Sequence, residues 1–282
     1  SEIDFQVSLF GFTTNIIAII TIVKSIKLHT SFGILCAAQA ANNSFVLVLN
    51  SMYLMPDSGI FAVGSMISRI VGMVGFILLQ IHENVQVGLS LWVAGIRFHI
   101  LISLNRLLVL AFPFASQRFI TSRSTSGAVA IALFASFVQC APLVLVDDLW
   151  FGYDHGKMQW VFAPNDLGRF YEANVNYLPI TIEFGCVLLL GIITVVYLRF
   201  ARSKTVKSDV SSKLSLEIRL FKQAFSQSIP LLITFIFFAF VTPLLSDQFG
   251  KFLSTTVMWH LAHGIDGLIV DLFHTRLNLF KK

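Results

Sequence analysis

Apolar runs of about 20 residues alternate along this chain with more polar connections. A bilayer core about 30 Å thick needs roughly 20 mostly apolar residues in a spanning helix, so each run predicts one transmembrane helix. The sequence therefore predicts an all-α membrane protein, a seven-transmembrane helix bundle that forms a single domain over residues 1–282. The predicted spans are 5–23, 33–55, 86–112, 126–146, 175–198, 224–245 and 252–273.

The basic residues predict how this bundle is oriented. Lys and Arg concentrate in loops on the cytoplasmic side of a membrane protein. With seven spans and the amino terminus outside, most of the 20 basic residues fall in cytoplasmic segments, above all in the serine-rich connection 199–223. The acidic and aromatic connection 147–174 then lies outside. We therefore expect an outside amino terminus and a cytoplasmic carboxyl terminus.

A weaker apolar segment, 59–81, tests this count. If it crossed the bilayer, the next helix would reverse, and Arg106, Arg118 and Arg123 would lie outside. The positive-inside bias disfavours that arrangement. We therefore interpret 59–81 as a non-spanning segment: a re-entrant or interfacial element, an outward extension of the third helix, or a product of gene modelling.

Composition agrees with a membrane protein and excludes several functions. Hydrophobic residues make up 56% of the chain and charged residues 12%, whereas soluble domains carry about 25% charged residues. The net charge of +5 belongs to the loops, so we expect a lipid bilayer as partner and no nucleic acid. The three cysteines lie inside apolar runs without CxxC spacing, which predicts no disulfide framework.

One charge stands out inside the apolar run "LISLNRLLVLAFP", where Asn105 and Arg106 interrupt the third span. About 20 residues of the span precede Arg106, so this residue is expected near the cytoplasmic edge, where a long side chain can reach water. It either anchors the helix at the interface, or it contacts a cytoplasmic partner or holds neighbouring helix ends closed.

Helical geometry favours a polar face on the third span. At 100° per residue, Trp92, His99, Ser103 and Arg106 fall within a stripe about 60° wide, whereas Arg97 and Asn105 point elsewhere. At 1.5 Å per residue, Trp92 lies about 21 Å from Arg106 along the axis. One face therefore connects the outer half of the membrane with its inner edge, unless the stripe serves helix packing alone.

The seventh span repeats the pattern, because Trp259, His263 and Asp266 share a face. A charge within a span costs roughly 2.5–3.5 kcal/mol at its centre, so Asp266 needs a partner. The candidates are Asn15, Asn42 and Asn43. Arg97 either pairs with Glu183 or reaches water.

No motif for catalysis or for a cofactor occurs in the chain. It contains no Walker loop, GxGxxG, HExxH or GxSxG, so the protein is not expected to be an enzyme or to bind a cofactor. His260 and His263 are too few for a metal site. Aromatic residues crowd the outer loop and the helix tops, which predicts a mainly apolar ligand pocket formed by Trp92, His99, Trp160 and Trp259.

Several stretches resemble the nematode serpentine receptor class x (Srx) family of chemoreceptors, within the rhodopsin-like seven-transmembrane G-protein-coupled receptors. The matching stretches are "SFGILCAAQAANN", "GLSLWVAGIRFHILISLNRLLVLAFPF", "MQWVF", "GIITVVYLR" and "VMWHLAHGIDGLI". The resemblance runs from about residue 11 to 275. Its most specific parts are the Ser103, Asn105, Arg106, Pro113 pattern and the Trp259, His263, Asp266, Gly267 pattern.

The resemblance implies a chemosensory receptor that changes helix packing when it binds an extracellular small molecule or peptide. Asn105 and Arg106, with Ser103, would correspond to the motif that restrains the cytoplasmic helix ends and meets a heterotrimeric G protein. Asn15, Asn42, His263 and Asp266 would form the polar network that repacks. The implied location is the plasma membrane, in sensory neurons the ciliary membrane.

The sequence departs from the family pattern in its cysteines, in the residue after Arg106, in an extra segment at 59–85 and in a short tail after Phe273. The family commonly pairs a cysteine near the start of 149–153 with one near the top of the third helix, and neither is present. Leu107 replaces the aromatic residue that usually follows the arginine. Two alternatives therefore stay open: a non-signalling decayed receptor, and a membrane transporter or ion-conducting protein whose polar pathway is lined by Arg97, Glu183, His263 and Asp266.

Overall fold

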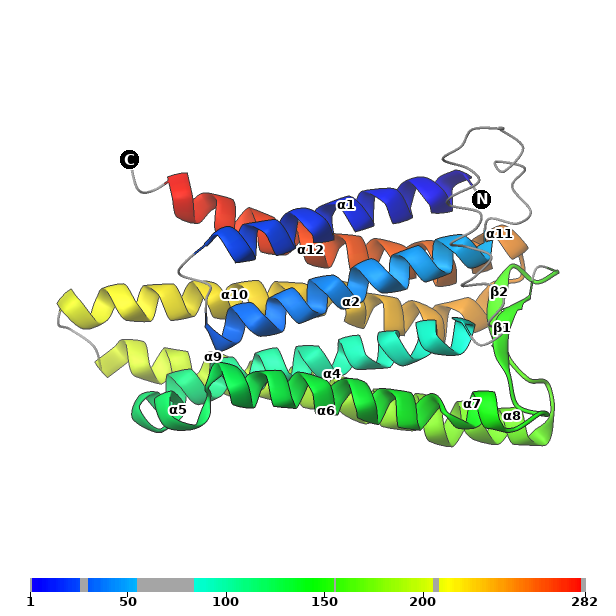
Figure 1. The fold of residues 1–282 in the computed structure, drawn as a ribbon, viewed down its shortest axis with the longest axis horizontal. Coiled ribbons are helices and arrows are strands. Elements are labelled where there is room, and N and C mark those ends of the chain that lie inside the picture. Colours follow the sequence, from blue (N-terminus) through cyan, green and yellow to red (C-terminus); the bar gives the residue numbers. More distant parts are fainter. Residues whose placement is uncertain (1, 26–29, 55–83, 155, 205–207, 280–282) are drawn as a thin grey trace.

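The computed structural model describes residues 2–25, 30–54, 84–154, 156–204 and 208–279. Long, roughly antiparallel helical rods form a bundle (Figure 1). The segment 59–81, expected not to span, lies outside the described residues. The helices are α1 Glu2–Lys24, α2 Ser31–Leu54, α4 Asn84–Ala111, α5 Pro113–Phe119, α6 Ser122–Cys140, α7 Pro142–Leu145, α8 Asp166–Phe170, α9 Leu178–Lys204, α10 Ser208–Ile236, α11 Gln248–Phe252 and α12 Met258–Leu279.

Shorter elements extend three of these rods at one end of the bundle. The π-helix η4, Tyr171–Tyr177, joins α8 to α9, and the π-helix η7, Leu253–Val257, joins α11 to α12. The π-helix η5, Phe237–Val241, and the 3-10 helix η6, Thr242–Leu244, continue α10. Single π turns occur often at functional sites, because they shift the side chains that follow them.

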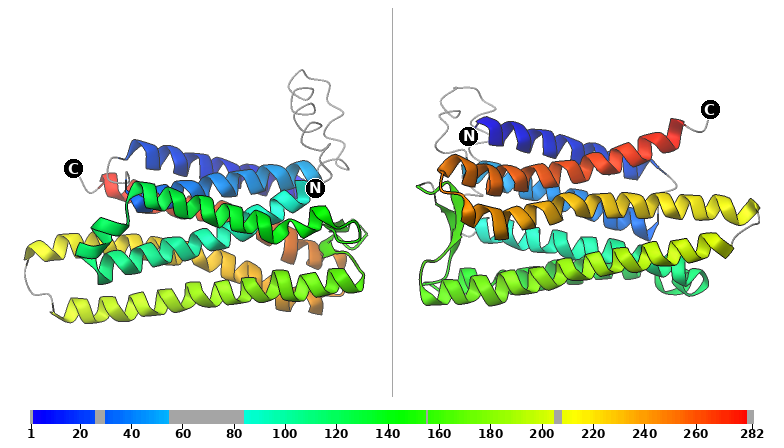
Figure 2. Two further views of the ribbon diagram at one scale, coloured as in Figure 1. Left: turned by 60° about the horizontal axis from the view of Figure 1, so that its bottom comes forward. Right: turned by 180° about the vertical axis from the view of Figure 1, so that it is seen from behind.

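Six rods of the described chain have the length and apolar composition of a membrane span. α12 contributes the seventh rod of the bundle and is more polar, since its inward face carries histidines and an aspartate. Figure 2 shows α1 and α12 side by side along one edge of the bundle, with α9 at the opposite edge. The seven-helix bundle predicted from the apolar runs is therefore the fold of this chain.

Two features of the connections differ from the sequence prediction. The stretch 147–174, expected to be a loop, contains an antiparallel hairpin of β1 Phe151–Asp154 and β2 Gln159–Phe162. The basic stretch 199–223, expected to be a connection, is helical over its described residues, 199–204 and 208–223. Lys, Arg, Glu and Leu are good helix formers in water, so hydropathy marks the bilayer crossing and underestimates the helix length.

Pro142, Pro230 and Pro243 affect their helices in different ways. α6 ends at Cys140, and Pro142 begins the short α7. α10 continues through Pro230, whereas Pro243 lies in the 3-10 turn that closes the sixth rod. The missing proline N–H is tolerated best in the first turn of a helix, which is where Pro142 stands.

The two ends of the bundle have different cores. The amino terminus, the hairpin and α11 lie at one end, which we call the hairpin end, and α5 and the carboxyl terminus lie at the other (Figure 1). An aromatic cluster that includes Phe151, Trp160 and Trp259 fills the hairpin end. A smaller, mainly aliphatic cluster, which includes Phe32 and Ile102, fills the α5 end.

Candidate functional site

The predicted polar stripe of α4 faces the interior of the bundle. His99 and Arg106 are polar residues in a mainly apolar helix, and both are buried, with 2% and 4% of their surface exposed. Ser103 lies between them and borders a cavity against α9 and α10. The stripe therefore runs along the inside of the bundle from the hairpin end to the α5 end.

Arg106 is held by contacts from two other helices. Its Nη1 donates a hydrogen bond to Oε2 of Glu217 on α10 at 3.0 Å, and the two side chains form an ion pair. Its Cζ lies 4.1 Å from the ring centroid of Phe32 on α2. Asn105, expected to point elsewhere, turns its Oδ1 back to accept a hydrogen bond from Nη2 of Arg106.

A buried polar network surrounds Asp266 in the middle of the bundle. Nδ2 of Asn43 donates to Oδ2 of Asp266 at 2.6 Å, and Nε2 of Gln227 donates to Oδ1 at 2.7 Å. Nε2 of His99 lies 3.9 Å from Oδ2. Each carboxylate oxygen thus accepts a hydrogen bond inside the bundle, which offsets part of the cost of burying the charge.

The asparagines predicted as partners of Asp266 take different places. Asn43 contacts Asp266 directly, whereas Asn42, one position away and 100° around the helix, donates to the Leu91 carbonyl at 2.9 Å. Asn15 donates to the His263 carbonyl at 2.9 Å and so joins α1 to α12. Asn43, rather than Asn42, is the α2 member of the network.

Sequence reasoning missed the glutamines of this network. Nε2 of Gln39 donates to Oδ1 of Asn43 at 3.2 Å and also lies 3.2 Å from Nε2 of His99. Gln223 donates to Gln227 at 3.4 Å and to Sγ of Cys36 at 3.7 Å. All three glutamines are buried. An amide inside a predicted span is the signal that would have found Gln39 and Gln227, because it needs a buried partner. Gln223 lies just before the predicted span 224–245, so this signal does not reach it.

An apolar chamber lies above this network, at the hairpin end. Its empty space is about 430 Å³, part of it open to the surroundings. Trp92 and Trp259, both predicted for a ligand pocket, line it, whereas His99 belongs to the network below and Trp160 lines a second chamber nearer the surface. We call the first the inner chamber; its walls are Leu89, Trp92, Phe151, Phe162, Asn176, Tyr177, Thr234, Phe235, Phe238 and Trp259.

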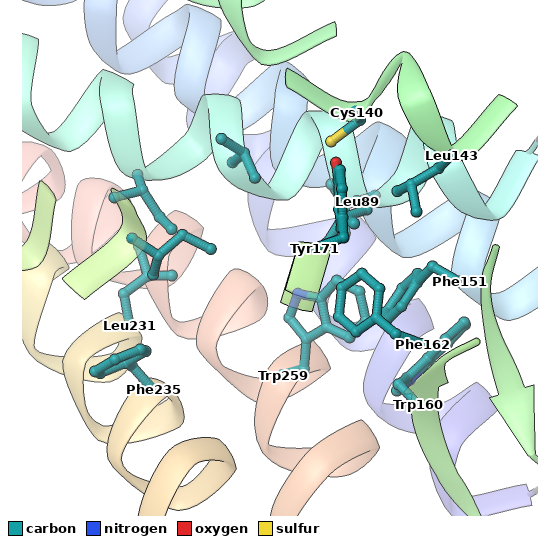
Figure 3. Packing of buried hydrophobic residues seen from close by; sticks show 14 of the residues in the cluster. Leu89, Cys140, Leu143, Phe151, Trp160, Phe162, Tyr171, Leu231, Phe235 and Trp259 are labelled. Carbon is teal, nitrogen blue, oxygen red and sulfur yellow. The ribbon is translucent and has the colours of Figure 1, made fainter. Parts of the chain in front are cut away.

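Aromatic rings of the hairpin close the inner chamber. The rings of Phe151 and Trp160 stack at 5.5 Å, and Trp160 meets Trp259 edge-on at 5.5 Å (Figure 3). Trp92 meets Trp259 from α4 at 6.0 Å, also edge-on. The cysteines of the described chain form no disulfide. Aromatic packing therefore holds this hairpin against the bundle, at the place where the family commonly has a disulfide.

An outer chamber adjoins the inner one and shares Phe162, Tyr177 and Phe238 with it. It encloses about 1050 Å³, part of it open to the surroundings, and carries charged side chains, among them Asp154 and Lys251. The backbone N–H of Lys157 donates to Asp154 and lowers the pKa of that carboxyl, which keeps it ionised. The outer chamber is therefore polar where the inner one is apolar.

Trp259 connects the inner chamber to the polar network. Its indole N–H donates to Nε2 of His263 at 2.9 Å. Because an indole nitrogen only donates, Nε2 must be the unprotonated nitrogen, and Nδ1 carries the proton. Nδ1 then donates to Oδ1 of Asn43 at 2.8 Å, and Asn43 donates to Asp266. One directed chain of hydrogen bonds thus runs from the chamber wall to the buried carboxylate.

The predicted pair of Arg97 and Glu183 is formed, away from this chain. Nε of Arg97 lies 2.8 Å from Oε1 of Glu183, and the two side chains are 19% and 17% exposed. Arg97 also donates to Ser136, at 2.9 Å, and to Gln139, both on α6. This cluster ties α4 to α6 and α9.

Within the described residues, no group of three or more His, Cys, Asp or Glu side chains could hold a metal ion.

Comparison with known proteins agrees with this architecture. The structure superposes on squid rhodopsin with a TM-score of 0.68 and 15% identity, covering 98% of this chain and 81% of that one, and so has its fold. The chain is 23% identical to serpentine receptor class X 45 of Caenorhabditis elegans, over 96% of this chain and 77% of that protein. The family model described as serpentine type 7TM GPCR chemoreceptor Srx matches residues 5–274. The chain therefore belongs to the Srx family of G-protein-coupled chemosensory receptors.

Proposed function

We propose that this chemoreceptor binds its agonist in the inner chamber and transmits the binding to Arg106 through the buried polar network. The observation that carries the proposal is the position of Trp259, whose ring lines the chamber while its N–H donates into the network at 2.9 Å. An agonist that moves this ring changes the hydrogen bond to His263. The ligand site and the network therefore share one side chain.

The chamber walls suggest the class of ligand. They are mainly aromatic and aliphatic, so a small, mainly apolar molecule fits them best. The indole nitrogen of Trp92 is buried and has no hydrogen-bond partner among the residues that the structure describes. A ligand with one hydrogen-bond acceptor, such as a carbonyl or ether oxygen, would satisfy it. The outer chamber provides the entry path on this proposal.

The contacts continue from the network to the α5 end. Asp266 accepts a hydrogen bond from Gln227, which in turn accepts one from Gln223. Gln223 also contacts Sγ of Cys36, which lies one helical turn from Phe32 on α2. Arg106 lies at the end of this series, joined to Glu217. Binding shifts the populations of two helix arrangements only if the ligand prefers one of them. On this proposal the agonist prefers the arrangement in which Arg106 is released from Glu217.

Released from Glu217, Arg106 would contact a heterotrimeric G protein. The bundle would lie in the plasma membrane with the hairpin end outside and the α5 end in the cytoplasm. The concentration of basic residues in the segments of the α5 end supports this orientation. The transporter alternative finds less support, because the chain belongs to a receptor family and its charged Arg97 and Glu183 form an ion pair with each other.

The experiment that tests the proposal needs no known ligand. Binding of radiolabelled GTPγS is measured, per surface receptor, in membranes of cells that co-express the receptor and a heterotrimeric G protein. Glu217→Gln should raise the agonist-free signal several-fold, because the neutral amide no longer holds Arg106. Arg106→Ala should abolish signalling without loss of surface protein.

The matched control is Asp166→Asn, which breaks the exposed pair of Asp166 and Arg169 at the hairpin end. This variant should signal like the wild type. If Glu217→Gln and Arg106→Ala also leave the signal unchanged, the proposed coupling role of Arg106 is wrong.

A further inference from the structure

Arg106 is a buried cation that makes fewer hydrogen bonds to the described residues than its guanidinium can form. It has five N–H donors, of which one binds Glu217 and one binds Asn105. Its Nε is buried and has no hydrogen-bond partner among the described residues. Asn105 is neutral, so Glu217 is the carboxylate that balances the charge. Something else must compensate for the remaining loss of solvation.

The ring of Phe32 occupies the place where this compensation is needed. Cζ of Arg106 lies 4.1 Å from the ring centroid, well inside the limit of about 6 Å for a cation–π contact. Phe32 has no exposed surface, so water does not screen the contact. A contact of this class shifts an equilibrium by roughly 2- to 30-fold, with the larger values at desolvated sites.

Phe32 and Glu217 hold the guanidinium from different helices. Phe32 lies in the first turn of α2, and Glu217 lies on α10. Cζ of the guanidinium lies over the ring of Phe32, while the carboxylate of Glu217 accepts a hydrogen bond from Nη1. The two contacts therefore do not compete, and the ring holds the side chain in the orientation that reaches Glu217.

We infer that Phe32 is a positioning residue that stabilises the resting receptor by binding the Arg106 guanidinium through its ring face. The inference rests on the proposed function, since it adds a second restraint to the release of Arg106. Loss of the ring electrons should raise agonist-free signalling even when the volume of the side chain is kept. A phenylalanine that only fills space would not show this dependence.

The test replaces Phe32 by phenylalanines with one, two and three ring fluorines, introduced by nonsense suppression. Fluorination withdraws electrons from the ring face and weakens a cation–π contact stepwise, with little change in shape. The agonist-free GTPγS signal should rise with each fluorine and reach about three- to tenfold with Phe32→Leu. The same series at Phe98, another fully buried ring of the bundle, is the matched control and should be flat.

A second measurement keeps the inference testable if signalling is weak. The thermal unfolding midpoint of the purified receptor is followed through the same fluorination series, with and without Arg106→Leu. The midpoint should fall along the series only when Arg106 is present, because the ring then loses its cation. Equal slopes with and without Arg106, or a flat signalling series, overturn the inference.

The two proposals fail in different ways. If Glu217→Gln raises the agonist-free signal and the Phe32 series stays flat, the inference is wrong and the proposed function stands. If the thermal series depends on Arg106 but neither Glu217→Gln nor the Phe32 series changes signalling, the proposed coupling fails, and the positioning role fails with it.

Discussion

The indole N–H of Trp259 donates a hydrogen bond to Nε2 of His263 across 2.9 Å, one helical turn along α12. This bond determines which nitrogen of the imidazole carries the proton, and through it the direction of the bonds to Asn43 and Asp266. A single donor on the wall of the inner chamber therefore orients a network that reaches the centre of the bundle.

Trp259→Phe removes this donor and keeps an aromatic ring against Trp92. Nε2 of His263 is then left as a buried acceptor without a partner, which costs about 1–3 kcal/mol. We expect the thermal midpoint of the purified receptor to fall by several degrees, at about 2–4 °C per kcal/mol. Trp150→Phe, at an exposed tryptophan of the outer chamber, is the control and should shift it little. Equal midpoints for the two variants would contradict the role of the indole N–H.

Glycine permits the close approach of α1 and α12. A Cβ added to Gly264 would lie 2.9 Å from Cα of Gly11, and Oγ1 of Thr14 donates to the Gly264 carbonyl at 2.9 Å. Gly264→Ala should therefore destabilise the bundle by about 1–3 kcal/mol through overpacking. Gly185→Ala, where a Cβ meets nothing within 4 Å, should be neutral or stabilising. Thermal midpoints measured in parallel decide the comparison.

The charged cluster on α4 should respond unequally to the loss of its two members. Arg97→Met leaves the Glu183 carboxylate in a span without its cation, whereas Glu183→Gln leaves Arg97 bonded to Ser136 and Gln139. Removing one partner of a buried pair costs about 3–5 kcal/mol, and partial exposure reduces that figure here. We expect Arg97→Met to lower the thermal midpoint more than Glu183→Gln.

The double variant of this pair is the decisive measurement. Because it removes both charges, it should be more stable than Arg97→Met alone. If the loss of stability in the double variant equals the sum of the losses in the two single variants, the pair contributes no coupling energy.

The sequence predicted the features of this site that lie on a single helix. It did not predict the contacts that depend on how one helix is rotated about its axis relative to another. The inward stripe of Trp92, His99 and Arg106 follows from the helical repeat alone. Choosing between Asn42 and Asn43 requires the rotation of α2 against α12, which a 100° repeat does not supply. The composition of α2 offers both residues equally.

Partners from distant segments were also beyond prediction. Nothing in the apolar run that begins near Phe32 distinguishes this ring from the other phenylalanines of the chain, and Glu217 stood in a stretch interpreted as a connection. The hairpin was missed because its residues have no strict alternation of polar and apolar positions. By contrast, Arg97 and Glu183 were paired correctly, because a charge in a span has few available partners.

The contact of Asn43 with Asp266 predicts that the two side chains can be exchanged. Nδ2 of Asn43 donates to Oδ2 of Asp266 at 2.6 Å, and Gln227 donates to the other oxygen at 2.7 Å. Asp266→Asn alone places an amide N–H against one of these donors, and Asn43→Asp alone places two carboxylates together. Each single variant should therefore lose most surface expression, since each leaves buried polar groups in conflict.

The double variant, Asn43→Asp with Asp266→Asn, keeps one carboxylate and one amide at the contact. It should recover a substantial part of the expression and of the thermal midpoint, although His263 now faces a carboxylate through its Nδ1 proton. Asn42→Asp with Asp266→Asn is the matched control, because Asn42 binds the Leu91 carbonyl and not Asp266, so it should not recover either property. Recovery by the control pair, or failure of the first pair, would show that Asn43 and Asp266 do not interact as a unit.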